Sequence, residues 1–211
     1  MPNWDIIAEC LRKWEALPFS TKLDIVKAVV EASLYDPMRA EGEWMWKQGQ
    51  KDAAQLYTEN AHLCQKCKGS CCGGRHFSVL DAYIALRCYP GLELPAPHTT
   101  EWAEKHGACV WLEPGKGCLL PRNARPVECA SYICATWEDA WLKFYKDGQK
   151  YRHLYLITLA EKAYGNLTRG AFLVQTWLDN NLETVLKRAY LTSEGRELFR
   201  IAFRYGGFLG G

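Results

Sequence analysis

Hydrophobic positions near the start of the chain recur at three- and four-residue steps, as one buried face of a helix requires. Trp4, Ile7, Leu11 and Trp14 show this spacing, and Pro18 is expected to end the helix they form. A second helix is expected next, with Ser20 or Thr21 as its cap. Its inner face would carry Leu23, Val26, Val30 and Leu34.

The pattern then predicts a break and a third helix. Pro37 is expected to break the chain, because proline cannot donate a backbone hydrogen bond. A helix is expected from about Gly42 to Ala61. Residues from about 136 to 205 are expected to be helical again, and their first aromatic stripe, which is typical of a core, comprises Trp137, Trp141, Phe144 and Tyr145.

Two further helix starts are expected in this last part of the chain. Asn180 with Glu183 forms a candidate capping box, in which each side chain satisfies a backbone N–H at the start of a helix. Thr192 or Ser193 is expected to open the last helix.

The stretch between the two helical parts has few periodic runs and many Gly, Pro and Cys residues. Ser78 and Asp81 predict a capped helix that stops near Pro90–Gly91. A short helix is expected to start at Thr99 or Thr100. The run CVWL, then EPGKG, then CLL predicts a small β-hairpin.

The register of this hairpin bears on a metal site, because side chains alternate faces along a strand. If Leu112 pairs with Gly117, Cys118 shares a face with Cys109. If Leu112 pairs with Cys118, the two cysteines face apart. A shared metal site therefore predicts the pairing of Leu112 with Gly117.

The expected fold is mainly α, a helical bundle wrapped around a loop-rich, cysteine-rich metal-binding lobe with one small β-hairpin. N-terminal helices would cover residues 1–61, the metal-binding lobe 62–135, and C-terminal helices 136–211, all packed as one compact domain. The chain has 211 residues, of which 48% are hydrophobic, and this is enough for a substantial core.

Charge and segment composition narrow the class of protein. The formal net charge is only +2 and no basic tract stands out, so neither nucleic acid nor a membrane is an expected partner. No secretory signal and no apolar run of about 20 residues is found. A cytoplasmic location is expected, where thiols stay reduced. An unknown protein or small molecule remains the expected partner.

Ten cysteines carry the candidate chemistry. Cys10 and Cys88 fall in expected helices and are interpreted as small packed hydrophobes. The other eight lie close together in sequence, and crowded thiols in a reducing compartment indicate a metal or an iron–sulfur centre. The candidate metal ligands are Cys64, Cys67, Cys71, Cys72, Cys109, Cys118, Cys129 and Cys134.

The spacing of these cysteines matches neither a zinc ribbon, which needs a second close pair, nor the bacterial ferredoxin run. Cys71 and Cys72 are adjacent, and adjacent side chains seldom both ligate one ion. Either they reach two centres, or one ligates while the other packs. Eight thiolates could make two four-coordinate sites or one four-thiolate cluster with additional cysteines around it.

Residues 64–134 resemble a known family. CQKCKGSCC, HFSVLDAYIAL and ACVWLEPGKGCLLPRNARPVECASYIC follow the order seen in the cysteine-cluster proteins described as zinc- or iron-chelating (YkgJ-type). All eight candidate cysteines and Arg125-Pro126 fall on matching positions. The spacer before the CC pair is one residue longer than usual, and Ala130 stands where an Arg is common. The flagellin lysine N-methylases are similar in this block and are considered to hold an iron–sulfur cluster.

Other side chains could assist the centre. Arg122 and Arg125 lie between expected ligands, where a guanidinium could raise the reduction potential of a cluster, hold an anionic substrate or make a structural contact. His62 and His76 flank the first cysteines and could replace a thiolate. Glu128 could act as a base.

The function expected from these observations is metal binding. An iron–sulfur cluster on cysteine thiolates, of the 4Fe–4S type, with a redox or cluster-dependent role, is favoured. The alternative is a structural zinc module that acts as a binding or scaffold domain. Whether the chain is an enzyme, such as an iron–sulfur oxidoreductase or a cluster-dependent transferase, stays open.

Overall fold

A computed structural model describes residues 2–67, 77–146 and 150–205. The chain is mainly helical with one small antiparallel hairpin, which confirms this part of the expected fold. The elements, in chain order, are α1 (Trp4–Ala16), α2 (Phe19–Ala32), α3 (Pro37–Cys67), α4 (Val79–Cys88), α5 (Thr100–His106), β1 (Leu112–Glu113), β2 (Gly117–Cys118), the 3-10 helix η1 (Arg122–Ala124), α6 (Val127–Ser131), α7 (Ala135–Lys146), α8 (Lys150–Arg188) and α9 (Ser193–Tyr205).

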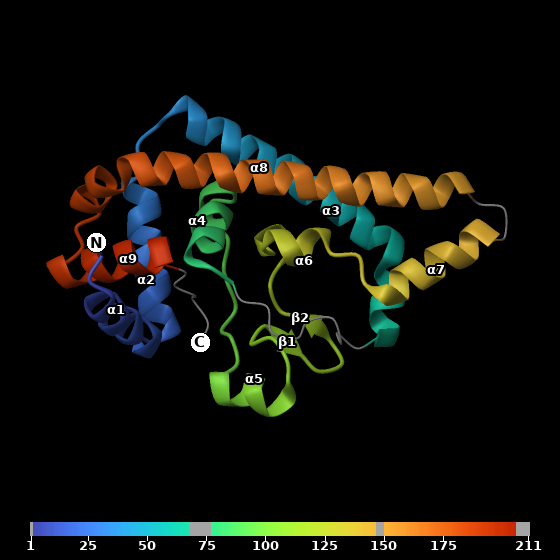
Figure 1. Ribbon diagram of the computed structural model, residues 1–211, viewed down its shortest axis with the longest axis horizontal. Helices are drawn as coiled ribbons and strands as arrows, with labels where there is room; N and C mark the ends of the chain where they lie inside the picture. Colours follow the sequence, from blue (N-terminus) through green and yellow to red (C-terminus); the bar gives the residue numbers. More distant parts are fainter. Residues whose placement is uncertain (1, 68–76, 147–149, 206–211) are drawn as a thin grey trace.

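The two longest helices, α3 and α8, run antiparallel along the length of the molecule (Figure 1). Their buried positions recur at alternating steps of four and three residues, the spacing of a coiled-coil seam. On α3 the seam comprises Gly42, Trp46, Gly49, Ala53, Leu56, Asn60 and Leu63. On α8 it comprises Leu156, Ala160, Ala163, Leu167, Gly170, Val174 and Trp177.

Small residues bring these two backbones close together. A Cβ atom added to Gly170 would lie 2.7 Å from the carbonyl oxygen of Gly42 and 2.7 Å from the backbone nitrogen of Trp46. One added to Gly49 would lie 2.8 Å from the backbone nitrogen of Leu167. Separations below 3.0 Å do not occur for real side chains, so glycine is required at this crossing.

Four of the remaining helices lie toward the two ends of the pair. α1, α2 and α9 pack together at one end, where Trp14 meets Phe199 edge-on with 6.4 Å between ring centroids (Figure 1). α7 lies at the other end, over the beginning of α8. A large hydrophobic cluster joins α1, α2, α4, α9 and the hairpin, and a second one joins the ends of α3 and α8 to α7.

Several helix boundaries differ from the expected ones. α2 begins at Phe19, and Pro18 occupies the capping position, so Ser20 and Thr21 are not caps. Pro37 is the first residue of α3, where its missing N–H costs nothing. The longer α3 therefore carries the backbone of Cys64 and Cys67 in its last turn.

In the last part of the chain, the helix start expected at Asn180 is wrong. Asn180 and Glu183 lie inside α8, which runs without a break to Arg188, so they are not a capping box. The capping box of Ser78 and Asp81 at the start of α4 is confirmed. Thr99 caps α5 by accepting a hydrogen bond from the Trp102 N–H at 3.2 Å.

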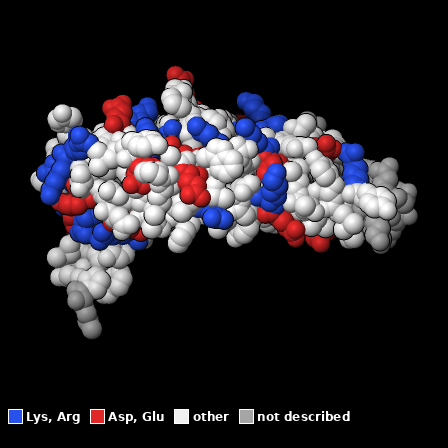
Figure 2. Space-filling view, turned by 90° about the horizontal axis from the view of Figure 1, so that it is seen from above, with Lys and Arg blue, Asp and Glu red and all other residues white. Residues whose placement is uncertain are grey.

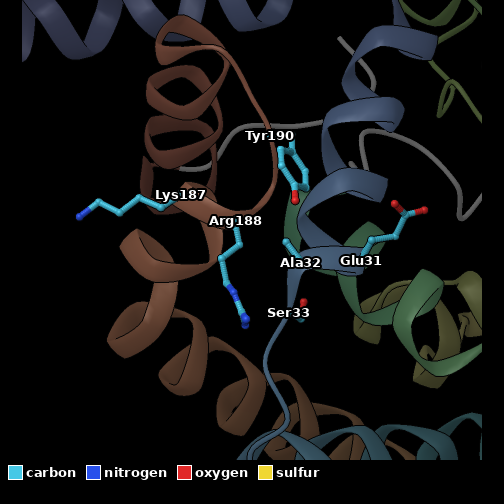
Figure 3. A pocket seen from close by; sticks show the side chains of 6 residues that line it. All are labelled: Glu31, Ala32, Ser33, Lys187, Arg188 and Tyr190. Carbon is cyan, nitrogen blue, oxygen red and sulfur yellow. The ribbon is translucent and has the colours of Figure 1, made fainter.

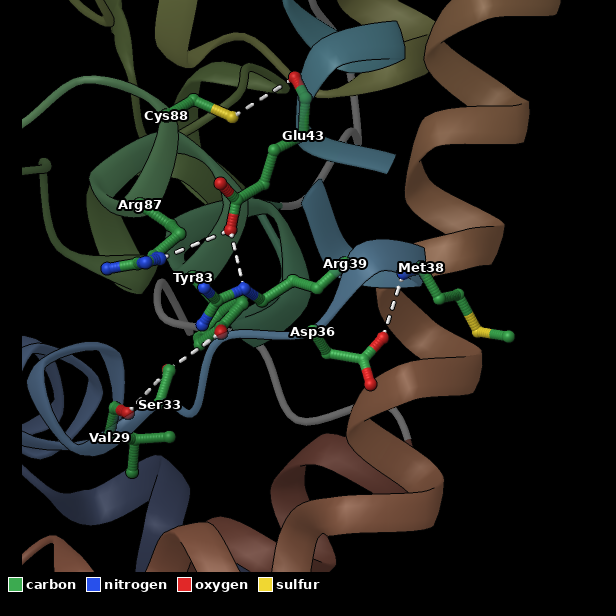
Figure 4. Close-up of polar contacts among 9 residues, drawn as sticks. All are labelled: Val29, Ser33, Asp36, Met38, Arg39, Glu43, Tyr83, Arg87 and Cys88. Carbon is green, nitrogen blue, oxygen red and sulfur yellow. Dashed lines mark hydrogen bonds and ion pairs between the residues drawn. The ribbon is translucent and has the colours of Figure 1, made fainter. Parts of the chain in front are cut away.

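A buried polar network connects α2, α3 and α4 (Figure 4). The carboxylate of Glu43 lies 3.0 Å from the Arg39 guanidinium and 3.1 Å from that of Arg87. The hydroxyl groups of Ser33 and Tyr83 are hydrogen-bonded at 2.8 Å. These contacts fix α4 against α3 and against the end of α2.

Charges of both signs are interspersed on the face shown in Figure 2, with uncharged surface between them. Among the described residues, no helix combines the length and the apolar character needed to cross a bilayer.

Candidate functional site

The structure places the eight candidate cysteines in different parts of the fold. Cys64 and Cys67 belong to the last turn of α3, but their side chains are outside the described part of the chain. Cys71 and Cys72 also lie outside the described residues. The remaining four are Cys109 ahead of β1, Cys118 in β2, Cys129 in α6 and Cys134 just before α7.

The hairpin has the register in which Leu112 pairs with Cys118 and Glu113 with Gly117. The expected pairing of Leu112 with Gly117 is therefore wrong. That pairing requires a strand through Cys109, but the Leu112 N–H donates to the Cys109 carbonyl at 2.9 Å and closes a turn there. Because this turn interrupts the alternation of faces, the register does not decide on which side Cys109 lies.

Cys109 and Cys118 lie close enough to influence one another electrostatically. Burial raises the pKa of the Cys109 thiol, the backbone N–H of Trp111 bonded to its sulfur lowers that pKa, and the neighbouring Cys118 raises it. Both side chains are half-buried and pack against the large core cluster. An N–H donated to a sulfur stabilises the thiolate, which is the form that binds a metal.

A ring contact joins the hairpin to the segment that carries the CC pair. The described chain resumes at Phe77, five residues after Cys72. The buried Phe77 ring meets Trp111 edge-on, with 5.8 Å between centroids. Phe77 is thus held against the turn that follows Cys109.

Cys129 opens onto a hollow of about 450 Å³ between α4, α6 and α8. Asp81 and Glu128 supply the acidic groups of this hollow, and Tyr164 forms one of its walls. The Asp81 carboxylate accepts hydrogen bonds from the Ser78 backbone N–H at 3.0 Å and the Ser78 hydroxyl at 2.7 Å. Burial of the carboxyl group nevertheless raises its pKa to about 6, and these hydrogen bonds oppose the rise.

Cys134 has a different environment. It is 7% exposed and belongs to the second hydrophobic cluster, which also contains Leu63, Trp137 and Trp141. Its carbonyl accepts the Trp137 N–H at 2.9 Å at the start of α7. Cys134 is therefore near the end of α3, because Leu63 directly precedes Cys64.

No group of three or more His, Cys, Asp or Glu side chains is arranged to hold a metal ion within the described ranges. Within these ranges, Cys109 and Cys118 are electrostatic neighbours. Cys134 lies near the last turn of α3. A complete ligand set would need cysteines whose side chains lie outside these ranges.

Two arginines of the segment between Cys118 and Cys129 lie on one tyrosine of α3. The Cζ atom of Arg122 is 4.1 Å from the centroid of the Tyr57 ring, and that of Arg125 is 5.2 Å from it. The buried Gln50 side chain donates to the Arg125 carbonyl at 2.9 Å. Tyr57 and Gln50 were not expected as site residues, although Tyr57 precedes Cys64 by seven positions and thus shares its side of a helix.

The histidines of the described ranges take part in no metal-binding group. His62 is exposed, and His76 lies outside the described residues. His98 Nε2 is 3.2 Å from the Glu113 carboxylate, in ion-pair range but without hydrogen-bond alignment, and the His98 ring stacks on Trp102 with 3.9 Å between centroids.

The two cysteines interpreted as packing residues lie in core environments. Cys88 is 3% exposed, its thiol donates to the Glu43 carbonyl at 3.6 Å, and burial raises its pKa to about 12 (Figure 4). Cys10 is half-buried against the large cluster.

A second hollow, of about 390 Å³, lies between the ends of α2 and α8. Figure 3 shows Lys187 and Glu31 pointing away from it on opposite sides, with Arg188 and Tyr190 between them. Tyr190 is fully exposed and has a φ of 52°. No cysteine lines this hollow, so it is separate from the candidate site.

Comparisons with known proteins add no relative. No family model matches the chain, and neither a curated protein nor a solved structure does.

Proposed function

We propose that this protein binds an iron–sulfur cluster, of the 4Fe–4S type, through cysteine thiolates, and that the cluster serves a redox or cluster-dependent role. The ligands would come from the Cys64–Cys72 run and from Cys109, Cys118, Cys129 and Cys134. Residues 62–135 would form a lobe around the centre, as in the YkgJ-type proteins that they resemble. A bound cluster would supply one-electron transfer.

The observation that carries this proposal is that Cys109 and Cys118 are electrostatic neighbours. A turn and a hairpin place these two cysteines within electrostatic reach of each other, a backbone N–H is bonded to the sulfur of Cys109, and the Phe77 ring contacts Trp111 two residues further on. The raised pKa of Cys109 means that its thiol stays protonated at neutral pH without a cation. A metal ion that displaces this proton would gain a half-buried thiolate ligand.

The charge distribution along the chain supports the same proposal. A cluster with four thiolate ligands is anionic, and nearby positive charges offset that charge. No Asp or Glu occurs between Glu59 and Asp81 or between Glu113 and Glu128. The basic residues in these two cysteine-bearing stretches are Lys66, Lys68, Arg75, Lys116, Arg122 and Arg125.

A structural zinc site is the second candidate, and the hairpin is also the observation in its favour. Cys109 and Cys118 supply the second close pair that a zinc ribbon needs and that the linear spacing lacks. Cys64 with Cys67 would complete four thiolates. In this case the metal would hold the lobe together and the protein would act as a binding module.

Purification without oxygen distinguishes the two candidates. We expect a brown protein with matched amounts of iron and acid-labile sulfide. Cys109→Ser and Cys118→Ser should lose most of both, whereas Cys10→Ser, which changes a half-buried thiol on α1, should keep them. A colourless protein with stoichiometric zinc would establish the second candidate instead. Wild-type iron and sulfide in both hairpin variants would refute the ligand assignment.

A further inference from the structure

Tyr57 is flanked by two cations that come from one short stretch of chain. The guanidinium carbons of Arg122 and Arg125 lie 4.1 Å and 5.2 Å from the centroid of its ring. A guanidinium is attracted to an aromatic face, but two guanidinium groups at one ring repel each other. Such a pair is stable when an anion lies between or beside the two groups.

Within the described part of the chain, neither arginine has an acidic partner. The Arg122 side chain donates to the Thr58 hydroxyl at 3.4 Å, a weak contact, and forms no ion pair. The Nε atom of Arg125 is buried and lacks a hydrogen-bond partner. Residues 68–76 contain no Asp or Glu, so this stretch of sequence has no carboxylate side chain. A buried donor without a partner is costly, which indicates that a ligand satisfies it.

The backbone that carries the two arginines is also held in place before any ligand arrives. Gln50, which is 4% exposed, donates to the Arg125 carbonyl at 2.9 Å. Arg122 begins η1, which packs against both α3 and α4. Fixing this backbone in advance lowers the conformational entropy that is lost when an anion binds. Arginine suits this task because its planar fork matches the geometry of an oxyanion.

We propose that Arg122 and Arg125 form a binding site for a small oxyanion, either a phosphate or a carboxylate group, at Tyr57. On α3 this site lies two helical turns before Cys64, about 10 Å along the axis. An anionic substrate or co-substrate bound here would lie beside the centre proposed above. Only this consequence rests on the proposed function, because anion binding needs no metal.

The test uses the full-length protein as purified, at low ionic strength. Inorganic phosphate is titrated and followed by the width of its ³¹P NMR signal, and succinate is followed by saturation-transfer NMR. Iron, sulfide and zinc are measured in the same samples. Wild-type protein should broaden the phosphate signal or saturate succinate, and the probe that binds more tightly identifies the oxyanion class.

Three variants complete the experiment. Arg122→Gln should weaken binding at least about tenfold, the effect of losing one charge-assisted hydrogen bond. Arg122→Lys, which keeps the charge but not the fork, should recover only part of this loss. Arg169→Gln removes the same charge from an exposed position of α8 and should bind like the wild type. Arg122 is exposed, so its replacement should not prevent folding.

Two results would overturn the proposal. One is the absence of binding of both probes by the wild-type protein. The other is equal binding by wild-type protein and Arg122→Gln. If Arg122→Gln instead lost iron or zinc while neither probe bound to the wild type, the arginines would serve the metal centre and not an external anion. Wild-type protein that binds phosphate but contains no iron, sulfide or zinc would count against the proposed centre alone.

Discussion

The guanidinium group of Arg39 lies 3.0 Å from the carboxylate of Glu43, one turn further along α3, and only 2% of the Arg39 side chain is exposed. The geometry is that of an ion pair without an aligned hydrogen bond, and Nη1 has no hydrogen-bond partner. Arg39 also stacks on Trp177 of α8, with its Cζ atom 5.1 Å from the ring centroid. A charge this deeply buried depends on its partner.

We therefore expect Glu43→Gln to be strongly destabilising, by about 3–5 kcal/mol, because it leaves a buried guanidinium without a countercharge. Glu9→Gln is the matched control, since its ion pair with Arg12 is exposed on α1 and should contribute less than about 1 kcal/mol. Urea unfolding of both variants measures the difference. Equal losses of unfolding free energy would show that the buried ion pair contributes no more to stability than the exposed one.

The close crossing of α3 and α8 gives a second prediction. Gly170→Ala places a methyl group 2.7 Å from backbone atoms of Gly42 and Trp46, which cannot move aside, so it should cost about 1–3 kcal/mol or more. Gly165→Ala, on the exposed side of the same helix, meets nothing within 4 Å and should stabilise the protein by about 0.5–1 kcal/mol. The two variants should shift the melting temperature in opposite directions. A stabilising effect of Gly170→Ala would contradict the close approach of the α3 and α8 backbones.

The buried carboxyl of Asp81 gives a third prediction. Its pKa is raised to about 6 in the folded chain, chiefly by burial, from an ordinary value of 3.8. Between pH 4 and pH 6 the unfolded chain ionises this group more readily than the folded chain does. The contribution of Asp81 to stability is therefore fully present below about pH 4 and is lost as the pH rises through 6.

Asp81→Asn checks this prediction, because the amide still offers an oxygen to the Ser78 N–H but does not titrate. The unfolding free energy of the variant, relative to the wild type, should rise as the pH increases from 4 to 7. Comparing the two proteins at each pH cancels the titration of all other groups. A difference that does not change with pH would show that the carboxyl has an ordinary pKa.

The helical class and most helix positions could be predicted from the sequence, but the seam that organises them could not. Gly42, Gly49 and Asn60 on α3 and Gly170 on α8 are not hydrophobic, so a search for apolar periodicity does not detect them. Residues that seldom favour a helix interior are tolerated there because close packing outweighs their propensity.

The candidate cysteines could be named from the sequence, but their arrangement in space could not be predicted from it. The crowding of cysteines predicts metal chemistry, which stays a prediction, whereas the capping of α4 by Ser78 and Asp81 was predicted from local rules and is confirmed. The predicted hairpin register was wrong because Cys109 lies in a turn. One backbone hydrogen bond closes this turn, and the residue types at these positions do not indicate it. The contacts of Tyr57 with Arg122 and Arg125 join distant parts of the chain and have no local signal.

The unbroken length of α3 makes the orientation of its last turn depend on packing far from it. Trp46 and Cys67 are separated by 21 residues of a single helix, roughly 30 Å along the axis. Each residue advances a helix by about 100°, so inserting one residue between Gly49 and Leu63 would rotate the backbone of Cys64 and Cys67 by that angle relative to the seam. The orientation of the backbone at Cys64 and Cys67 therefore depends on a glycine crossing several turns away, so the length of α3 matters to the candidate site as well as the identity of its residues.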